Sequence, residues 1–199
     1  KLPRPLHPWN ITPARAIEVQ RELAVRVSHA PMEHVPRFVA GLDAAFSRDG
    51  RHCIAGVVLW DVGRREVVEQ HVAFAPLTFP YVPGLLSFRE APALLAALEK
   101  LKHAPDVLMC DGQGVAHPRR FGIACHLGVL LDLPAVGCAK SRLVGLHAEL
   151  PSARGSSVPL MDGGQQIGEL VRTRDEVKPV FVSVGHRITL KQARRLVME

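Results

Sequence analysis

Val-Leu-Met-Cys-Asp-Gly-Gln-Gly-Val-Ala-His-Pro-Arg-Arg, residues 107–120, is the stretch of sequence that decides the fold. Its apolar start is typical of a buried strand and ends in an acid, Asp111, which two glycines and a basic cluster follow. An acid at the carboxyl end of a strand faces the crevice in which open α/β sheets bind ligands. Glycines let a ligand approach the backbone closely, and arginines attract phosphate. The stretch therefore predicts a strand that ends at the floor of an active site.

Upstream of this stretch, the sequence predicts three strands joined by short turns. Apolar runs with strand character occupy residues 38–46, 53–60 and 66–74. The connections Arg48-Asp-Gly50 and Asp61-Val-Gly63 are so short that they favour antiparallel neighbours, and the three strands should form a meander. A helix is predicted before them, over residues 11–28, with Thr12 as its N-cap and Pro13 at its first helical position.

Downstream, strands and helices alternate along the chain. We predict helices near 87–101 and 123–131, short strands at 107–110 and 134–138, a glycine- and serine-rich loop over 152–162, further strands at 167–172 and 179–184, and a closing helix over 189–198. Alternation of this kind indicates parallel pairing with crossover connections. A meander followed by parallel units gives a mixed α/β sheet flanked by helices, the architecture of the ribonuclease H-like nucleases. The 199 residues fit one such domain, residues 1–199.

The composition narrows the class of protein. Hydrophobic residues make up 47% and charged residues 22%, an ordinary globular balance. No apolar run approaches the ~20 residues that span a bilayer, and no secretory signal is present, so we expect no membrane partner. Four cysteines lie far apart in apolar contexts, which favours buried free thiols and a cytoplasmic location. A net charge of +6 favours a polyanionic partner, although many basic proteins bind no nucleic acid.

Three acids are candidates for catalysis. Asp43 interrupts an apolar strand, where a buried carboxylate needs a partner or a metal, and the alternative is an edge-strand acid that faces solvent. Asp111 could instead belong to a simple Asp-Gly turn, although Pro118 breaks the segment that follows. Glu90 fits a capping box that starts at Ser87, in which it would only satisfy a backbone N–H. If the three acids meet, their oxygen-rich cluster suits Mg²⁺, which can activate water against a phosphodiester.

Further candidates lie around these acids. Lys140 would face the same crevice and hold a phosphate, or be merely solvated. His117 could act on a base edge or a phosphate, or be an exposed loop histidine. Tyr81 stands between Pro80 and Pro83, which restrict the loop, so it could be inserted between stacked bases at small entropic cost. The alternative is a tyrosine that packs against its own domain. No Walker loop, GxSxG elbow or zinc-ligand spacing is present, and we expect no organic cofactor.

Together these residues resemble the endonuclease V family of deoxyinosine-directed repair nucleases. The resemblance covers nearly the whole chain, from Val39 to the final helix. Its most specific parts are Val39-Ala-Gly-Leu-Asp43, Pro80-Tyr-Val-Pro-Gly-Leu-Leu-Ser-Phe-Arg-Glu90 and Asp111-Gly-Gln-Gly-Val-Ala-His-Pro-Arg-Arg120, and Gly137-Cys-Ala-Lys140 and Gly185-His-Arg187 also match. The second of these stretches is too long for a chance match.

The resemblance implies a ribonuclease H-like fold and a reaction. The reaction is Mg²⁺-dependent hydrolysis, with Mn²⁺ as a substitute, of the second phosphodiester bond 3′ to an inosine in DNA, leaving 3′-hydroxyl and 5′-phosphate ends. Carried over by position, Asp43 and Asp111 would bind metal, Glu90 would complete the catalytic acids and Lys140 would sit at the scissile phosphate. The DNA wedge would be Pro80, Tyr81, Val82 and Pro83. The base pocket would be formed by Gly84, Leu85, Gly112, Gly114, His117 and Gly122.

The chain departs from the family pattern at its end. The family continues into a segment with a further histidine or aspartate near the metal, whereas this sequence stops at Glu199, so we expect that a C-terminal tail is missing. Two alternatives stay open: another ribonuclease H-like nuclease that cuts hybrids or junctions, and a non-catalytic inosine-binding module. The sequence also leaves open whether DNA or RNA is the substrate, whether one or two metal ions bind, and the oligomeric state.

Overall fold

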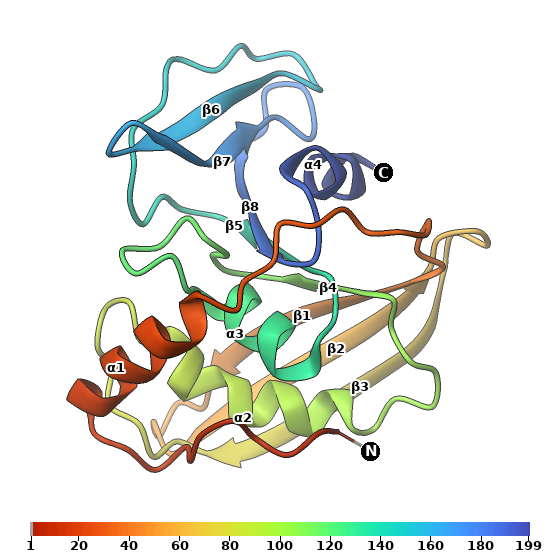
Figure 1. Cartoon of the computed structure of the whole chain (residues 1–199). Coiled ribbons are helices and arrows are strands. Elements are labelled where there is room, and N and C mark those ends of the chain that lie inside the picture. Colours follow the sequence, from red (N-terminus) through yellow and green to blue (C-terminus); the bar gives the residue numbers. More distant parts are fainter. Residues whose placement is uncertain (1) are drawn as a thin grey trace.

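A mixed sheet forms the centre of the computed structural model, with helices packed against it (Figure 1). The structure describes residues 2–199, and Lys1, which belongs to the predicted domain, lies outside the described residues. The strands of the described part are β1 (Phe38–Phe46), β2 (His52–Asp61), β3 (Glu66–Pro76), β4 (Val107–Cys110), β5 (Ala135–Ala139), β6 (Ser157–Asp162), β7 (Gln165–Val171) and β8 (Val180–His186). Its helices are α1 (Pro13–Ala24), α2 (Leu86–Leu98), α3 (Ile123–Leu131) and α4 (Leu190–Met198).

The strand order β3-β2-β1-β4-β5-β8-β7-β6 confirms the predicted mixed sheet. β1, β2 and β3 pair antiparallel, as their short turns require, whereas β1 pairs parallel with β4 and β4 with β5. α2 and α3 supply the crossover connections. Because β1, β4 and β5 run in the same direction, their carboxyl ends meet at one edge of the sheet, which we call the carboxyl edge. The amino edge is the opposite one, where β1 and β4 begin.

The predicted loop over residues 152–162 is wrong, because its second half forms strand β6. This strand pairs antiparallel with β7 through a turn at Gly163 and Gly164, which have φ angles of 58° and 79°. Leu160 supplies the buried side chain that holds β6 in place, at 1% exposure. Pro159 makes the segment look irregular in sequence, but β6 is the last strand of the sheet, and proline is tolerated in edge strands.

The core between α2 and the meander fixes where the carboxyl edge meets that helix. Small and branched side chains of β1 and β2, such as Ala40, Leu42 and Val57, are at most 3% exposed and belong to one cluster with Leu94 and Leu98 of α2. Burial of each such leucine stabilises the fold by about 1.5–3 kcal/mol. The packing brings the first turns of α2 to the carboxyl edge. No helix in the described part of the chain has the length and hydrophobicity that crossing a bilayer requires.

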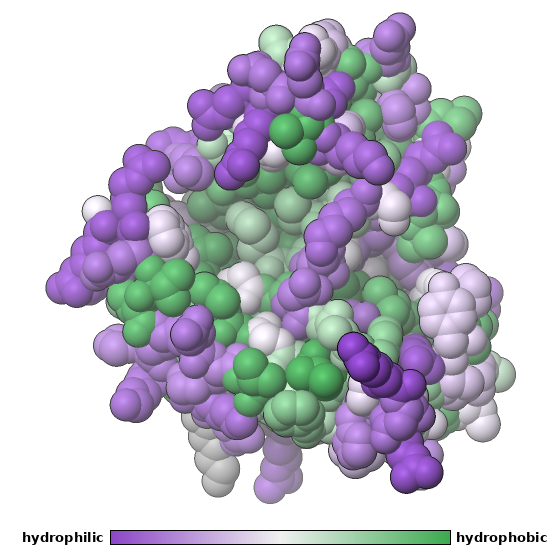
Figure 2. All heavy atoms as spheres, turned by 180° about the vertical axis from the view of Figure 1, so that it is seen from behind, coloured by the Kyte–Doolittle hydropathy of each residue, from purple (hydrophilic) through white to green (hydrophobic). Residues whose placement is uncertain are grey.

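The face of the meander opposite α2 is open. Trp60, Val72 and Phe74 are 38%, 52% and 66% exposed, and Figure 2, the view from behind, shows hydrophobic residues around and inside a hollow on this side of the molecule. The hollow has a volume of about 430 Å³, and residues of β1, β2, β4 and α4 line it. One face of the meander thus carries the core, and the other presents apolar side chains at the surface.

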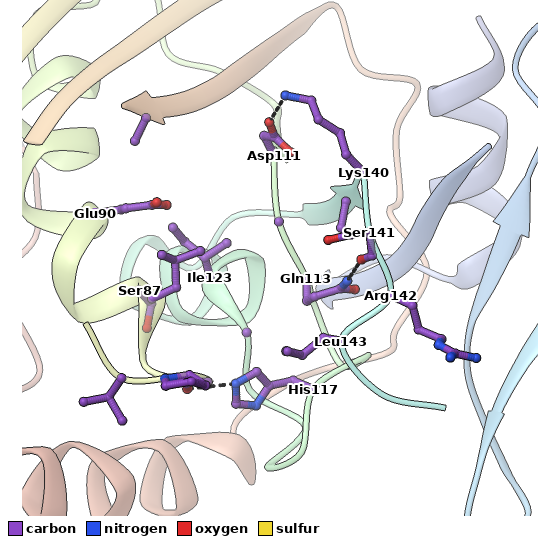
Figure 3. A pocket seen from close by; sticks show the side chains of 18 of the residues that line it. Ser87, Glu90, Asp111, Gln113, His117, Ile123, Lys140, Ser141, Arg142 and Leu143 are labelled. Carbon is purple, nitrogen blue, oxygen red and sulfur yellow. Dashed lines mark hydrogen bonds and ion pairs between the residues drawn. The ribbon is translucent and has the colours of Figure 1, made fainter. Parts of the chain in front are cut away.

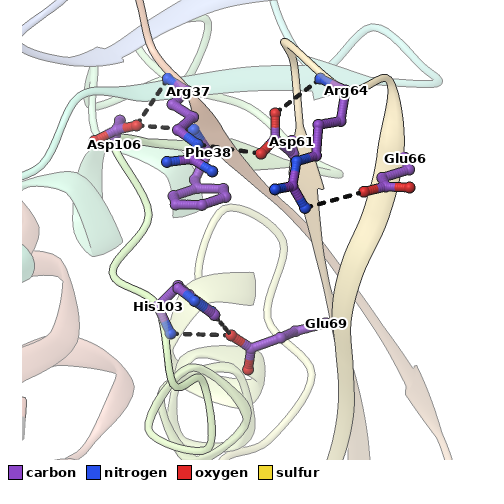
Figure 4. Close-up of polar contacts among 8 residues, drawn as sticks. All are labelled: Arg37, Phe38, Asp61, Arg64, Glu66, Glu69, His103 and Asp106. Carbon is purple, nitrogen blue, oxygen red and sulfur yellow. Dashed lines mark hydrogen bonds and ion pairs between the residues drawn. The ribbon is translucent and has the colours of Figure 1, made fainter.

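Three carboxylates tie the loops of the amino edge to the sheet (Figure 4). Asp106 accepts the backbone N–H groups of Arg37 and Phe38, each at 2.8 Å, just where β1 begins. Asp61 accepts from the backbone N–H of Arg64 at 2.9 Å and from Arg37 Nε at 3.1 Å. These bonds, the one from Arg64 first, hold the pKa of Asp61 below its ordinary value. The acids at this edge therefore serve to anchor backbone.

Glu69 anchors the loop between α2 and β4 in the same way. Its carboxylate accepts the backbone N–H groups of Lys102 and His103, each at 2.9 Å, and His103 Nδ1 lies 2.6 Å away. The Lys102 bond is the largest cause of a pKa of about 2 for Glu69. A carboxylate with so many donors stays ionised and has little capacity left for a ligand.

Candidate active site

A cavity of about 440 Å³ opens at the carboxyl edge (Figure 3). Its walls come from the end of β1, the start of α2, the β4–α3 connection and the segment after β5. Of the predicted site residues, it is lined by Asp43, Tyr81, Val82, Pro83, Gly84, Glu90, Asp111, Gly112, His117, Gly122 and Lys140. Asp43 and Lys140, which lie 97 residues apart in the sequence, thus meet around one space.

Lys140 bridges the two strand acids of this cavity. Its ammonium nitrogen contacts Asp111 Oδ2 directly and lies 3.9 Å from Asp43 Oδ2. Asp111 follows the last residue of β4, and Lys140 follows the last residue of β5, so parallel pairing of the two strands brings the side chains together. The contact with Asp111 is also the first cause of a raised pKa for Lys140. The lysine is therefore a fixed positive charge between two carboxylates.

The prediction that Asp43 is a buried carboxylate is wrong, and so is the edge-strand alternative. Its side chain is 68% exposed, yet β1 lies between β2 and β4 in the sheet. The reason is that pairing with β4 ends at Leu42 and Cys110, so β1 runs on beyond its neighbour. Asp43 therefore lies beyond the end of β4 at the carboxyl edge, where it lines the cavity.

Glu90 enters the cavity from α2, across from Asp111 and Lys140 (Figure 3). The capping box predicted as its alternative role is absent: the N-cap is Leu85, without a side-chain bond, and the Ser87 hydroxyl lies 2.9 Å from His126 Nδ1 instead. Glu90 is 7% exposed, and its carboxylate makes no hydrogen bond within residues 2–199. Burial first, then the charges of Asp43 and Asp111, raise its pKa to about 8.

These acids suit a divalent cation in chemistry, although they do not form a closed metal cage. Within residues 2–199, no group of three His, Cys, Asp or Glu side chains is close enough to hold a metal as it stands. Asp43 and Asp111 nevertheless converge on one cation, the Lys140 ammonium, and carboxylate oxygens are the ligands that Mg²⁺ prefers. A metal would also relieve the repulsion that raises the pKa of Glu90. The donor set therefore fits such an ion, and Asp43 and Asp111 are the residues that could hold it.

The loop before α2 presents Tyr81 at the mouth of the cavity. Its side chain is 72% exposed, so the alternative of a tyrosine packed within its own domain is wrong. Phe79, at 4% exposure, anchors the loop, and Arg89 Nη1 donates to the Phe79 carbonyl at 2.7 Å. The Arg89 guanidinium lies 4.7 Å from the ring centroid of Phe46 and 5.8 Å from that of Tyr81. The exposed aromatic ring is thus carried by a loop that buried Phe79 and its bond to Arg89 anchor to the domain.

His117 is buried, which excludes the alternative of an exposed loop histidine. It is 3% exposed, and its Nε2 lies 2.9 Å from the Gly84 carbonyl. Burial is the main cause that lowers its pKa to about 4, so the ring is neutral at physiological pH. With Nε2–H donating to Gly84, Nδ1 is free to accept the backbone N–H of Arg119 at 3.1 Å. The histidine therefore belongs to the fixed wall of the cavity.

Three predicted residues do not line the cavity. Pro80 is exposed and lies outside it, and Leu85 is fully buried in the core. Gly114 packs against β8, where an added Cβ would lie 2.0 Å from the Val184 carbonyl oxygen. Gly122 does line the cavity, and a Cβ there would meet the Gln113 carbonyl at 2.2 Å, so this part of the wall must be bare backbone.

The sequence reasoning missed two cavity residues of α1 and the β4–α3 connection. Gln113 donates from Nε2 to the Ser141 carbonyl at 2.8 Å and so ties the Lys140 segment to the loop after Asp111. Gln20 is 1% exposed, and it lies on the buried face of α1 beside Val19 and Leu23. A polar residue on an otherwise apolar helix face is a signal that could have identified Gln20.

Comparison with known proteins points to one family. A sequence model of the family "Endonuclease V" matches residues 21–199. An endonuclease V of Trichormus variabilis is 50% identical over 188 residues, which cover 94% of this chain and 85% of that protein. An endonuclease V of a Roseiflexus species is also 50% identical, over 96% of this chain and 85% of its own length.

Solved structures agree with the sequence matches. The crystal structure of an endonuclease V from Streptomyces avermitilis has a TM-score of 0.88 at 44% identity and covers 95% of this chain and 85% of that one. A Ciona intestinalis endonuclease V in complex with a 24mer DNA containing an inosine followed by a ribo-adenosine has a TM-score of 0.80 at 25% identity, with 93% and 87% covered. The chain is thus similar to these proteins in sequence and in fold over nearly its whole length.

Proposed function

The chain belongs to the endonuclease V family of metal-dependent nucleases, and from this premise we propose that it repairs DNA by recognising deoxyinosine and hydrolysing the second phosphodiester bond 3′ to it. The products would carry 3′-hydroxyl and 5′-phosphate ends. The match over most of the chain favours this function over a hybrid- or junction-cutting nuclease and over a non-catalytic binding module.

In this proposal the strand acids hold the catalytic metal. Asp43 and Asp111 would be ligands of Mg²⁺, or of Mn²⁺ in its place, and Glu90 would complete the acidic group. Such an ion polarises a phosphodiester and activates water when it is bound. Lys140 would bind the scissile phosphate, and its ion pairs support this role because they keep the ammonium at the acids. The side chain is 76% exposed, so a phosphate can reach it from solvent.

Base recognition would fall to the loop and the backbone wall. Pro80, Tyr81, Val82 and Pro83 would form the wedge, with the exposed Tyr81 ring filling the space that the flipped base leaves. Gly84, Gly112, His117 and Gly122 would contact the base, with Leu85 and Gly114 supporting the wall from behind. Hypoxanthine lacks the exocyclic amine of guanine, and a tight wall of backbone can exclude that amine sterically.

The observation that carries the proposal is the shared cavity, in which three acids and Lys140 lie beside an exposed, framed tyrosine. The test is to incubate duplexes that differ in one nucleotide, inosine or adenine, with the protein and Mg²⁺. We expect one cut in the inosine strand, at the second phosphodiester on its 3′ side, and a nick that a ligase can reseal. Equal cutting of both duplexes, or cutting of neither, would overturn the proposal.

We further infer that residues 1–199 form one ribonuclease H-like domain and that it works in the cytoplasm. The eight strands belong to one continuous sheet, which supports the single domain. All four cysteines are free thiols, three of them buried, and burial raises the pKa of Cys53 to about 11. Unpaired thiols that stay protonated are typical of proteins from a reducing compartment. Fractionation of cells that express the tagged protein would test the location.

A further inference from the structure

The carbonyl oxygen of Gly84 is surrounded by three side-chain donors from two distant parts of the chain. Gln20 Nε2 donates to it at 2.9 Å, Arg119 Nη2 donates at 2.8 Å, and His117 Nε2 lies at 2.9 Å. A carbonyl oxygen has two lone pairs, so three donors saturate it. Such an arrangement fixes both the position of this peptide group and the direction in which its oxygen points.

Gln20 is the member of this group that reaches in from α1, 64 residues before Gly84 in the sequence. Besides Gly84, its amide nitrogen donates to the Phe121 carbonyl at 3.1 Å, and its amide oxygen accepts from Arg119 Nε. The side chain is 1% exposed, so every polar atom of a buried amide is used. The family match begins at residue 21, one position after Gln20.

Gly84 lies where the loop that carries Tyr81 meets Leu85, the N-cap of α2. Its φ angle is +77°, which favours glycine, and an added Cβ would lie 2.8 Å from Arg119 Nη2. The preceding Pro83 has a fixed φ, so the direction of the loop depends largely on how the Gly84 peptide is held. Tyr81, at the tip of the loop, is exposed, and its ring makes a cation–π contact with the Arg89 guanidinium at 5.8 Å.

We propose that Gln20 is a positioning residue for damage recognition: it holds the Gly84 carbonyl with His117 and Arg119, and thereby aims the Tyr81 loop at the DNA. The inference rests on the proposed function, because it requires that Tyr81 enters the duplex. Gln20 itself touches neither the scissile phosphate nor the catalytic acids in this account. Gln20 affects recognition by positioning the Tyr81 loop, and an experiment can distinguish this role from a contribution to the stability of the fold.

The test compares Gln20→Met with wild type on an inosine duplex that carries 2-aminopurine beside the inosine, in the presence of Ca²⁺. Fluorescence of 2-aminopurine rises when its neighbour is unstacked, and this reports entry of the wedge. We expect the variant to lose most of the fluorescence rise and roughly tenfold in cleavage rate with Mg²⁺, since a displaced loop no longer meets the duplex correctly. Binding to undamaged duplex should be unchanged.

A double-mutant cycle with Tyr81→Ala shows whether Gln20 acts through the loop. Once the Tyr81 ring is removed, Gln20→Met should lower the cleavage rate little further. If the two residues acted independently, their rate losses would multiply. Full multiplication in the double variant, or wild-type fluorescence in Gln20→Met, would overturn the inference. A wild-type protein that does not distinguish inosine from adenine would instead refute the proposed function, so the two failures are distinguishable.

Two further variants keep the test interpretable. Gln20→Glu retains an acceptor for Arg119 but places a carboxylate against the Gly84 carbonyl. It should therefore cleave inosine-containing DNA as poorly as Gln20→Met. Cleavage at the wild-type rate would contradict the inference, because it would show that Gln20 serves Arg119 alone. Gln20→Asn is a milder change, which withdraws the amide by one methylene and should show a smaller loss of the same kind if the methionine variant does not fold. As a control of the same residue type, Gln192→Met removes an amide that donates to the Met32 carbonyl at 2.9 Å and does not line the cavity, so it should leave the fluorescence rise intact.

Discussion

The two edges of the sheet use the same residue types in opposite ways. At the amino edge, Asp61, Glu69 and Asp106 each accept two or more N–H bonds, and the pKa values of Asp61 and Glu69 are lowered. At the carboxyl edge, the acids have few such donors, and burial and neighbouring charge raise the pKa of Glu90 to about 8. The pKa values at the two edges differ because the N–H donors around the carboxylates differ, and not because the residue types do.

This contrast indicates which carboxylates are available for chemistry. An acid that already holds the backbone of a loop gains little from a metal or a phosphate and loses a structural contact if it moves. An acid whose charge is uncompensated gains from any cation that approaches. Asp43 and Asp111 share Lys140, and Glu90 lies across the cavity from them. This arrangement supports the proposal that the carboxyl edge binds a divalent cation.

The largest expected effect is on cleavage, from Asp111→Asn. This change removes a proposed metal ligand but keeps the shape of the side chain, and we expect cleavage of inosine-containing DNA to fall by about 10³-fold or more. DNA binding should persist, because a negative charge has been removed from the site. Asp61→Asn at the amino edge is the control, and it should cleave normally once folded. Loss of DNA binding by Asp111→Asn would contradict the assigned role.

The next effect is on stability, from Glu90→Gln in metal-free protein. The pKa of Glu90 rises from an ordinary 4.5 to about 8 on folding, so the folded state binds the proton more tightly, and stability should fall as the pH rises from 4.5 to 8. Above that window the free energy of unfolding is lower by about 5 kcal/mol. The glutamine cannot ionise, so the variant should be more stable than wild type at pH 8.5. Urea unfolding in the presence of a chelator measures this, and a less stable variant would refute it.

At the amino edge, Glu69→Gln should act in the opposite direction. The pKa of Glu69 falls from 4.5 to about 2 on folding, so its contribution is present above pH 4.5 and is lost as the pH falls towards 2. The variant should melt roughly 5 °C lower than wild type at pH 7, because an amide cannot accept all of the N–H donors that surround this position. Its cleavage rate at low temperature should match wild type. A variant that melts like wild type would show that these bonds contribute nothing.

Tyr81→Ala should have the smallest effect on the fold and a moderate one on recognition. The ring is 72% exposed, so the free energy of unfolding should change by less than about 0.5 kcal/mol. Preference for an inosine duplex over its adenine counterpart should drop roughly tenfold, since stacking of one ring on a base contributes about 1–3 kcal/mol. Competition binding of the two duplexes measures the preference, and an unchanged ratio would exclude the ring from recognition.

Local patterns in the sequence were enough to predict most of the sheet. Apolar runs and short turns identify the meander, and the strand before Asp111 is predicted with the bounds that β4 has, Val107–Cys110. Strand β6 was not predicted, because Pro159 and the neighbouring serines are residue types typical of loops. The segment becomes a regular strand only through its pairing with β7. Local propensity therefore describes well those elements that have a strong pattern of their own.

The details of the site depend on register and on long-range contacts, which sequence patterns do not contain. Asp43 is exposed because β1 extends beyond the end of β4, whose last pair with β1 is Cys110 with Leu42. The spacing of Ser87 and Glu90 suits a capping box equally well, and only the start of α2 at Leu86 excludes it. Gln20 reaches Gly84 across 64 residues of sequence, so no local pattern could reveal their contact.

The most direct test of the account is a calorimetric titration of Mg²⁺ into the protein, with Asp43→Asn, Asp111→Asn and Asp61→Asn in parallel. We predict saturable binding to wild type and to Asp61→Asn, and at least about tenfold weaker binding to either variant of the carboxyl edge, because each loses an ionised oxygen ligand. Binding that is equally strong in all four proteins, or that is lost only in Asp61→Asn, would contradict the claim that the acids of the carboxyl edge share a divalent cation.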